Sequence, residues 1–518
     1  MSASPEPEAR IRWWPLVVIV GITSAALAWV GTGELHDRQG AYLISAAIGV
    51  SALTLIFIWL VLLSRLPGRS RLRAVLAVVV VVVGLVTTVR IQGVSGDLVP
   101  IFEWRWGSEG GSPDAGVRET SEAVRLPESL EGLVDSPQFF GPNRLGKLDG
   151  PRLARDWVAR PPKLLWRRPV GAGWSGFAVA FGRAITQEQR AEQELVVCYE
   201  VATGEPLWTH SNRARYFTTL GGTGPRATPT IVANRVLALG ATGILDCLDL
   251  ATGALIWSRD ILEEHGAGLP EWGVAGSPLV RENRVIVCAG GTDGRSLVAH
   301  DLATGAFVSG GGSAPAHYGS PLFAVLLGRP QIIIFHAYGV TGHDEQTLAP
   351  VWTHPWKRNH PHVCQPVVVG KDRIFVSSGY GTGGELLSLE RDPTGSIRAS
   401  RRWRSLSMKA KFCNVIEKGG FVYGLDDGIL ACVDLASGRR RWKQGRYGHG
   451  QILLVGELLL VMGESGEVAL VEPGNGRELA RIEVFDMKTW NPPALAGRYL
   501  FVRNHREAAC YRLPIADG

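Results

Sequence analysis

The sequence lacks the short motifs that carry the commonest enzyme chemistries. It contains no nucleophile elbow, no phosphate-binding loop and no glycine fingerprint for a dinucleotide. Its seven cysteines include no C-x-x-C pair and no adjacent pair, and no two of its 12 histidines are four residues apart. We therefore expect no zinc site and no helical pair of metal ligands, and the sequence predicts no metal-binding residue.

Charge is also scarce, because Asp, Glu, Lys and Arg make up 20% of the residues and the formal net charge is +6. No basic block is interleaved with aromatic residues, which argues against a nucleic-acid partner. The densest basic runs, Arg401-Arg402 and 439–441, are expected on solvated strand faces. Glycine and tryptophan, by contrast, number 64 and 17 in a chain of 518 residues. This length and composition are typical of a turn-rich repeat protein with an added membrane part.

Three hydrophobic runs near the N-terminus predict membrane-spanning helices over about 13–33, 41–64 and 72–91. A span requires about 20 apolar residues, and the shorter third run is flanked by Arg73 and Arg90, whose long side chains can reach the interface. The first run could alternatively be a signal peptide. Against that alternative, no small-residue cleavage site follows it and two more spans come next.

The membrane region, residues 1–92, carries its positive charge unevenly. The N-terminal segment has Arg10 and Arg12, the loop after the first span has only Arg38, and the next loop has four arginines within 65–73. Because positive residues favour the cytoplasmic side, the N-terminus and the second loop should lie inside. The chain is thus expected to be a multi-pass protein of the cytoplasmic (inner) membrane, in contact with the lipid bilayer, with everything after the third span on the outer, periplasmic side.

Residues 93–134 are predicted to form a flexible linker, since 107–132 is rich in Gly, Ser, Glu and Pro. The ordered outer domain is expected over 135–518. Within it, the string CYEVATGEPLW at 198–208 recurs as CLDLATGALIW at 247–257. The spacing between such copies along the chain predicts a propeller or a similar array, with four short strands in each repeat. The acidic residue of the repeated turn, or its equivalent, lies at Glu200, Asp249, Asp301, Asp344, Glu390, Asp434, Glu472 and Arg512.

The repeated residues have a structural explanation. Gly253 can take a positive φ in the turn, and Asp249 and Thr252 can bond to turn backbone groups. Trp257 then lies on the outermost strand, where its ring can fill the seam between neighbouring blades and its indole can find an acceptor. Tryptophan occupies this position at Trp166, Trp208, Trp257, Trp352, Trp403 and Trp442, and Ser309 and Ala480 replace it twice.

The ends of the repeat region predict how it closes. Trp166 precedes every acidic turn, and the chain stops just after a third strand at 509–513. The 164–170 strand should therefore complete the last blade, which removes both sheet edges. The count is then eight blades.

Residues 165–513 resemble the quinoprotein-alcohol-dehydrogenase-like family of eight-bladed β-propellers with PQQ-type tryptophan-docking repeats. The strings FFGPNRLG (139–146), TQEQR (186–190) and GHGQ (448–451) resemble membrane-anchored members of this family. The resemblance implies an all-β fold. It also implies a mouth on the propeller axis where family enzymes bind PQQ. Those enzymes use a calcium ion held by Glu, Asn and Asp, a catalytic Asp and, often, a disulfide between adjacent cysteines.

The loops that lead into the innermost strands should form that mouth. They include two cations and three histidines but no carboxylate, which favours an anionic or hydrogen-bonding ligand. Alternatively, these residues pack the loops or hydrate the axial channel. The candidate ligand-binding residues are Trp174, Arg226, His317, His362, Gln365, Lys411, Asn414, His449, Gln451, Trp490 and Asn491.

Several features depart from the family enzymes. Calcium needs several oxygen ligands, and Asn414 and Asn491 alone would be a poor site. Glu188 and the pair Asp426-Asp427 are interpreted as surface turn residues. The cysteines that lie two residues before the turn acid are interpreted as small buried apolar residues, because equivalent positions in different blades are too far apart to bridge. They are Cys198, Cys247, Cys432 and Cys510.

These observations favour a membrane-anchored, extracytoplasmic propeller that binds a ligand or a protein, without a catalytic residue and without a cofactor. It is similar in idea to the propeller lipoprotein of outer-membrane assembly. The alternative is a PQQ-dependent quinoprotein dehydrogenase that delivers electrons to the membrane. A third possibility is a sensor, although the short inner segments leave no room for a cytoplasmic output domain.

Overall fold

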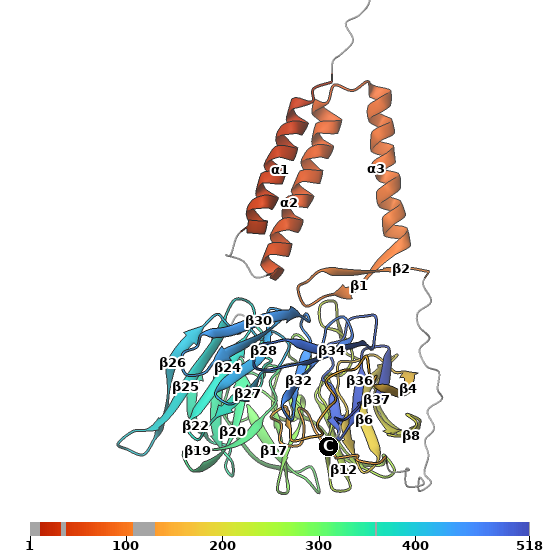
Figure 1. The fold of residues 1–518 in the computed structure, drawn as a ribbon. Coiled ribbons are helices and arrows are strands. Elements are labelled where there is room, and N and C mark those ends of the chain that lie inside the picture. The colour runs from red at the N-terminus through yellow and green to blue at the C-terminus, as the bar shows by residue number, and fades with distance from the viewer. Residues whose placement is uncertain (1–10, 33–37, 107–129, 358–359, 517–518) are drawn as a thin grey trace, which may run out of the picture. The chain divides into compact units, whose positions relative to one another are not determined.

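The computed structural model describes residues 11–32, 38–106, 130–357 and 360–516. The chain divides into two compact units, Met1–Glu109 and Gly110–Gly518. The first contains the helices α1 to α3, and the second contains the repeats (Figure 1).

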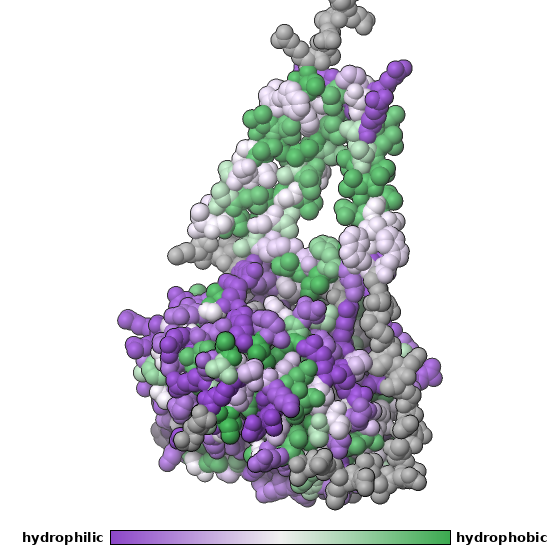
Figure 2. Space-filling view, turned by 45° about the vertical axis from the view of Figure 1, so that its right-hand side comes forward, coloured by the Kyte–Doolittle hydropathy of each residue, from purple (hydrophilic) through white to green (hydrophobic). Residues whose placement is uncertain are grey.

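Three helices of the first unit are long and apolar enough to cross a membrane. They are α1 (Trp14–Thr32), α2 (Arg38–Ile58), which continues as the π-helical turn η1 (Trp59–Leu63), and α3 (Gly68–Thr88). Many of their hydrophobic side chains are exposed, and the hydrophobic colour predominates over the helices in Figure 2. Such a surface favours an apolar solvent, so the length and composition of these helices support the predicted membrane association.

The π-helical turn joins the first two helices at one end. Its wider ring lets the Ser64 N–H donate to Trp59 O at 2.8 Å. The Trp59 indole Nε1 donates to Arg12 O at 2.8 Å, and the Arg12 N–H donates to Ser64 O at 3.2 Å. The Trp13 and Trp59 rings lie 5.8 Å apart. Backbone groups at the start of α1 are therefore satisfied by the end of η1.

The chain after α3 is more ordered than we expected. The end of the predicted third span and the first part of the predicted linker form a hairpin of β1 (Val89–Val94) and β2 (Pro100–Trp104). Arg90 lies in β1 rather than at a helix end, and its guanidinium pairs with Glu103 across the hairpin at 3.1 Å. The linker prediction was wrong for these residues, and 107–129 lie outside the described residues.

The second unit is built from consecutive antiparallel sheets. Each of the repeats contributes a sheet, and the chain passes from one sheet to the next in sequence order (Figure 1). Seven have four strands and one has five among the described residues. The first four sheets consist of β5 (Ala178–Ala180), β6 (Arg183–Arg190), β7 (Gln193–Glu200) and β8 (Pro206–Asn212); β11 (Thr230–Val232), β12 (Arg235–Leu239), β13 (Ile244–Asp249) and β14 (Leu255–Asp260); β15 (Leu279–Arg281), β16 (Arg284–Cys288), β17 (Leu297–Asp301) and β18 (Phe307–Gly311); β19 (Leu322–Leu326), β20 (Arg329–His336), β21 (Gly339–Asp344) and β22 (Pro350–Pro355).

The remaining sheets follow the same order, with two additions from the N-terminal side. The strand β3 (Lys147–Leu148) adds in parallel to β31, and β4 (Lys163–Pro169) pairs antiparallel with β37, beside which it lies in Figure 1. The sheets consist of β23 (Val367–Val369), β24 (Arg373–Ser378), β25 (Gly383–Arg391) and β26 (Ile397–Ser405); β27 (Ile416–Lys418), β28 (Phe421–Asp426), β29 (Ile429–Asp434) and β30 (Arg440–Arg446); β3, β31 (Gln451–Val455), β32 (Leu458–Met462), β33 (Glu467–Val471) and β34 (Glu478–Glu483); β35 (Ala494–Ala496), β36 (Tyr499–Arg503), β37 (Glu507–Arg512) and β4.

The repeated turn is a hydrogen-bonded unit. Asp249 Oδ1 accepts from the Thr252 N–H at 2.9 Å, from the Thr252 hydroxyl at 2.9 Å and from the Ala251 N–H at 3.0 Å. Gly253 has φ +74°, and a Cβ added there would lie 2.5 Å from the Trp208 ring of the preceding sheet. The glycine is therefore needed for its backbone conformation and for the space that the neighbouring tryptophan takes.

The docked tryptophans join neighbouring sheets. The Trp208 indole donates to Leu250 O at 3.0 Å, and the Trp257 indole donates to Leu302 O at 3.1 Å. Trp166, Trp403 and Trp442 bond in the same way to Val201, Leu435 and Pro473. The predicted role in the seam is confirmed for these residues.

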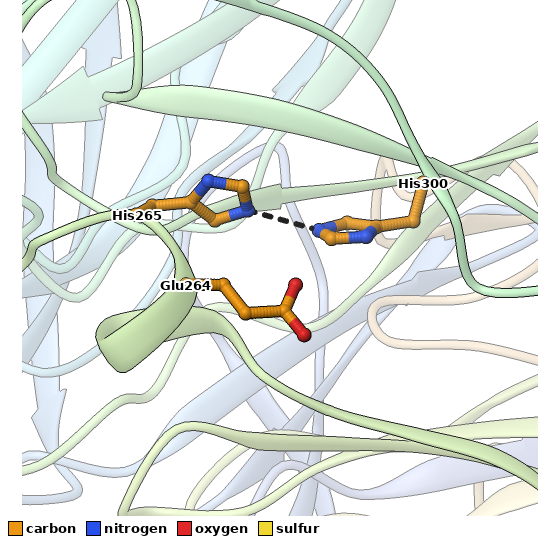
Figure 3. A group of neighbouring side chains, drawn as sticks. All are labelled: Glu264, His265 and His300. Carbon is orange, nitrogen blue, oxygen red and sulfur yellow. Dashed lines mark hydrogen bonds between the residues drawn. The ribbon is translucent and has the colours of Figure 1, made fainter.

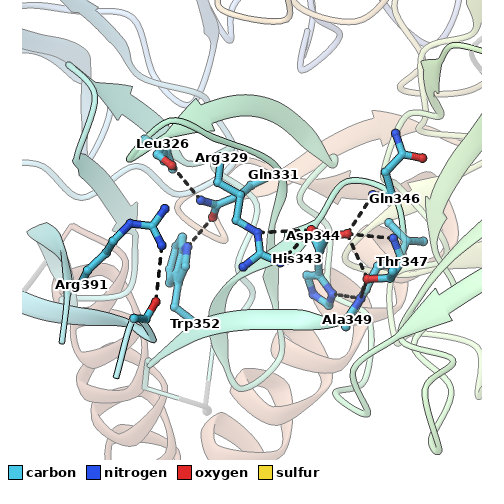
Figure 4. Close-up of polar contacts among 12 residues, drawn as sticks. Leu326, Arg329, Gln331, His343, Asp344, Gln346, Thr347, Ala349, Trp352 and Arg391 are labelled. Atoms are coloured by element: carbon cyan, nitrogen blue, oxygen red, sulfur yellow. Dashed lines mark hydrogen bonds and ion pairs between the residues drawn. The ribbon is translucent and has the colours of Figure 1, made fainter. Parts of the chain in front are cut away.

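One repeat departs from this pattern. The Trp352 indole stays within its own sheet and donates to the Gln331 side chain at 2.6 Å (Figure 4). The next sheet has long strands, and its turn acid is Asp392, which accepts from the Thr394 and Ser396 N–H groups. Glu390, our predicted turn acid, instead lies in β25 opposite Arg398. That prediction was wrong because the extended hairpin shifts the turn by two residues. The shift also removes the backbone carbonyl that accepts the docked indole in the other repeats.

Candidate ligand-binding mouth

Phe412 lies at the centre of a group of rings contributed by different loops. Its ring centroid is 5.1 Å from that of Trp490, 5.6 Å from His449, 6.3 Å from Tyr380 and 6.4 Å from Trp272. Trp272 precedes β15 and Phe412 precedes β27, three sheets further along the chain. Rings from well-separated sheets thus meet in one place. We call the seven rings of this group the aromatic layer: Trp174, Trp272, Tyr318, Tyr380, Phe412, His449 and Trp490.

The aromatic layer brings together several predicted mouth residues. The Trp174 ring lies 5.1 Å from Trp490. Tyr318 lies 5.6 Å from Trp272 and 5.4 Å from His317. His317 in turn lies 4.6 Å from His362. The layer therefore continues as one chain of rings from Trp174 to His362.

Cations lie against the faces of this layer. The Lys488 ammonium lies 4.1 Å from the Trp490 ring centroid and 4.8 Å from that of Trp174. The Lys411 ammonium lies 5.1 Å from the Tyr380 centroid, and the Arg226 guanidinium lies 4.5 Å from the centroid of Tyr216, a ring outside the layer. Aromatic faces stabilise such cations where water is limited. Burial lowers the pKa of Lys488 to about 8 and the pKa of Arg226 to about 10.

A carboxylate is present in the mouth, contrary to our expectation. Glu464 Oε1 accepts from the Trp490 indole at 2.8 Å, and Glu464 Oε2 accepts from the His449 N–H at 2.9 Å. Glu464 lies in the connection between β32 and β33. The predicted mouth residues, by contrast, lie on the loops that lead into the first strand of each sheet. Lys488 was missed as well, although it lies only two residues before Trp490.

The predicted amide side chains are buried and bonded to backbone groups. Asn414 Oδ1 accepts from the Gln365 N–H at 2.8 Å. Gln451 Nε2 donates to Phe412 O at 2.9 Å and to Trp490 O at 3.2 Å. Asn491 Nδ2 donates to Gly173 O at 3.0 Å and to Ser175 O at 2.9 Å. These three amides therefore hold the mouth loops in place.

The two predicted histidines of the fourth sheet's loops are also held by the protein. His362 is fully buried, stacks on Phe335 with centroids 4.4 Å apart, and has its ring nitrogens 2.7 Å from His336 O and 2.8 Å from Lys357 O. His317 Nδ1 accepts from the His362 N–H at 3.2 Å. Burial, together with neighbouring His362, lowers the pKa of His317 to about 4, so this ring is neutral at pH 7.

Residues 136–148, which we call the plug segment, lie against the first strands of several sheets. The Ser136 backbone pairs with Val179 of β5, and Pro137 O accepts from the Ile231 N–H of β11. The β3 part of the segment pairs with β31. First strands line the inner edge of each sheet in a propeller-like fold. The plug segment therefore fills space along that inner edge.

Arg144 fixes the plug segment. Its guanidinium is buried and donates to Ser277 O and Pro278 O, each at 2.8 Å, and burial lowers its pKa to about 9. The Arg144 carbonyl accepts from Gln365 Nε2 at 2.5 Å. A predicted mouth residue, Gln365, is thus committed to the plug segment.

The carboxylates interpreted as surface turns are buried, so that interpretation was wrong. Glu188 lies inside β6 and accepts from the Gly171 N–H at 2.7 Å, the Arg190 guanidinium at 2.9 Å and the Tyr199 hydroxyl at 2.5 Å. The Asp426-Asp427 pair is neutralised by lysines. Lys443 Nζ lies 2.5 Å from Asp426 Oδ2, and Lys409 Nζ lies 2.5 Å from Asp427 Oδ2.

The donor set of the mouth does not fit the PQQ–calcium group that the family resemblance implies. Calcium takes about 6–8 oxygen ligands, usually with carboxylates among them. Both oxygens of Glu464 and the Asn414 oxygen already accept protein hydrogen bonds. Among the described mouth residues, Gln365 Oε1 and Asn491 Oδ1 are buried amide oxygens that accept no hydrogen bond, and two amide oxygens do not make a calcium site.

A small hairpin adds an exposed apolar edge beside the mouth. The strands β9 (Phe217–Thr218) and β10 (Gly222–Thr223) pair between β8 and β11. Gly221 O in its turn accepts from the Trp174 indole at 2.7 Å and from Arg226 Nη2 at 3.0 Å. Phe217 and Leu220 are 57% and 42% exposed. We call this hairpin, residues 217–223, the lip.

The cysteines are free and buried. In the repeats, Cys198 pairs across the ladder with Trp208, Cys247 with Trp257, and Cys432 with Trp442. A small side chain opposite each docked indole suits the packing that we predicted for them.

Comparison with known proteins shows that the second unit is similar to propeller proteins in fold. Residues 192–444 match the family model described as outer membrane protein assembly factor BamB. The crystal structure of BamB from Moraxella catarrhalis is 17% identical, with a TM-score of 0.50, and the match covers 68% of this chain and 100% of that one. A europium-containing methanol dehydrogenase is 11% identical, with a TM-score of 0.55 over 73% of this chain and 98% of that one. No curated protein matches. At these identities the solved structures show the fold alone.

Proposed function

We propose that this chain, a PQQ-like repeat propeller with apolar N-terminal helices, is a membrane-anchored binding or scaffold module without catalytic activity. The observation that carries the proposal is the occupation of the mouth by the chain's own residues. The aromatic layer closes it around Phe412, and the plug segment follows the inner edges of the sheets behind it.

The architecture of the module is part of this proposal. The eight sheets form a closed ring, and the pairing of β4 with β37 supports that closure. The three apolar helices anchor the chain in the cytoplasmic membrane with the N-terminus inside, which the arginine distribution of the sequence supports. The ring then lies on the outer side of the membrane, where its loops can contact a ligand or a protein partner.

The lip and the cations beside it favour a protein partner. Phe217 and Leu220 expose apolar surface that water solvates poorly, next to Arg226 and near Lys488. A segment with apolar and acidic side chains would match both features. The description of the matching family as an assembly factor supports a protein-binding role as well.

A titration with PQQ tests the proposal. The full-length protein in detergent is titrated with PQQ with and without calcium, while tryptophan fluorescence is followed. Trp174 and Trp490 lie in the mouth and would report occupation. We expect no saturable, calcium-dependent quenching.

The Trp174→Phe variant is the control for this titration. Quenching that is equal in the wild type and in this variant is nonspecific absorption or collision, and it leaves the proposal standing. Saturable quenching that requires calcium and weakens in Trp174→Phe would contradict the proposal. It would favour the alternative of a PQQ-dependent dehydrogenase.

A further inference from the structure

A group of two histidines and one carboxylate lies apart from the mouth, between the second and third sheets. Glu264 ends the short helix α4 (Ile261–Glu264), His265 follows it, and His300 lies in β17. One ligand atom from each of the three lies within 4.8 Å of the others. In Figure 3 the Glu264 carboxylate lies beside the line that joins the two imidazole rings.

The separation of the two imidazoles suits a shared ion. The Nε2 atoms of His265 and His300 face each other at 3.2 Å. Two nitrogens bound to zinc at about 2.0–2.1 Å in a tetrahedral site lie roughly 3.3–3.4 Å apart. The nitrogen separation therefore lies within about 0.2 Å of that value, so the two rings need mainly to tilt until both lone pairs point at one ion. The exposed Glu264 can supply a third ligand.

The surroundings of His300 fix the tautomer that this ring needs to bind a metal, whereas His265 donates from Nε2 in the contact between the rings and must move its hydrogen to Nδ1 on binding. His300 Nδ1 lies 3.0 Å from Gly305 O, so this nitrogen carries the hydrogen and Nε2 presents its lone pair. Arg259 Nε donates to the same carbonyl at 2.9 Å, which holds the Gly305 turn in place. Both histidine side chains are buried, at 6% and 0% exposure, so water competes little for their nitrogens.

Neighbouring charges limit the affinity. Arg259 Nη1 lies 3.5 Å from Glu264 Oε1, and the Arg295 guanidinium lies 3.9 Å from the Phe307 centroid beside His265. Both cations repel a metal ion. Metal binding by Glu264 therefore competes with its ion pair to Arg259.

We propose that Glu264, His265 and His300 bind a divalent transition-metal ion of the zinc class and thereby clamp the second sheet to the third. Two imidazoles and a carboxylate are a ligand set that zinc accepts, with a fourth position left for water. The sequence pattern did not predict this site, because its histidines are 35 residues apart and come together only through the packing of two sheets.

Metal titration of the full-length protein in detergent tests the proposal. The protein is stripped with a chelator and titrated with Co²⁺, whose visible absorption reports tetrahedral coordination, and with Zn²⁺ in competition with a chromophoric chelator. We expect a single equivalent per chain. Glu264→Gln should weaken zinc binding at least as much as the roughly 10- to 100-fold known for loss of an outer-shell partner, and His300→Gln should abolish it.

His354→Gln is the matched control, because His354 pairs with Glu385 at 3.0 Å in another sheet. This variant should bind zinc like the wild type. Zinc should also raise the Tm of the wild type and of His354→Gln but not that of Glu264→Gln. Because Glu264 is exposed, its variant tests the site even if a buried histidine variant fails to fold. Absence of stoichiometric binding, or wild-type affinity in Glu264→Gln, would overturn the proposal.

Discussion

At the scale of single residues, each glycine of the repeated turn has two functions. Gly253 has a positive φ, and its missing Cβ leaves room for the Trp208 ring of the preceding sheet. The first requirement follows from the turn pattern in the sequence. The second could not be predicted, because it depends on the contact between two repeats.

Gly253→Ala is predicted to be more destabilising than a substitution that only strains the backbone. The added Cβ would lie 2.5 Å from the Trp208 ring, and the positive φ adds a further cost. Gly395 also has a positive φ, +84°, but has open space around its Cβ position, so Gly395→Ala is the control. We expect Gly253→Ala to lower the free energy of unfolding by about 1–3 kcal/mol more than the control, measured by urea unfolding. Equal losses would show that the docked ring does not constrain the turn.

Buried charges were the residues that sequence reasoning interpreted least well. Glu188 and Asp426 were placed on the surface because each lies close to a turn in the sequence. Their partners Arg190 and Lys443 lie two and 17 residues away, and burial arises only when the sheets assemble. The mouth carboxylate Glu464 was missed because it lies in the connection after β32 and not in a loop that leads into a sheet.

At the scale of elements, the repeated strands were predictable and the added elements were not. The strands follow a pattern that recurs along the chain, so each copy supports the others. The lip, the helix α4 and the plug segment occur once, and their positions are set by single contacts such as that of the Trp174 indole with Gly221 O. The positions of the mouth residues were predicted from their loops, but the hydrogen bonds that several of them make to the protein's own backbone were not predicted.

Arg144→Gln is predicted to release the plug segment. The glutamine cannot reach both Ser277 O and Pro278 O, which would leave a buried carbonyl without its charged donor. We expect a loss of about 2 kcal/mol or more in the free energy of unfolding, with faster hydrogen exchange over 136–148. Arg152→Gln is the control, since Arg152 is exposed. Exchange as slow as in the control variant would contradict the role of Arg144.

At the scale of the whole molecule, acid should destabilise the second unit before its carboxylates titrate. Burial lowers the pKa of His336 to about 3 and those of His343 and His317 to about 4. Between pH 6.5 and about 4 the unfolded chain therefore binds more protons at these positions, so stability falls as the pH falls. Glu194, whose pKa burial raises to about 7, offsets one of these protons.

The pH dependence is measured by urea unfolding between pH 7 and pH 4.5. We expect a slope of more than about 1 kcal/mol per pH unit, because one net proton corresponds to about 1.4 kcal/mol per unit. His343→Gln should reduce this slope. A flat profile in the wild type would contradict the neutral, buried state of these histidines.

The proposed orientation can be read from cysteine labelling. The native cysteines are free and buried, so they should react slowly. Val158 is 96% exposed, and Val158→Cys should be labelled by a membrane-impermeant maleimide in intact cells with a permeable outer layer. Labelling only after the cytoplasmic membrane is opened would place the propeller inside and contradict the proposal.

The central proposal, that this chain is a binding module and that its lip receives a protein partner, is tested most directly by site-specific photo-crosslinking in cells. A photoreactive amino acid replaces Phe217 or Leu220 in the full-length protein, and Val325, which is 51% exposed on β19, is the matched control position. The account predicts a discrete crosslinked protein from both lip positions, absent at Val325, and weakened when Lys488 is changed to Glu. No crosslinked product at the lip, or the same products at all three positions, would contradict it.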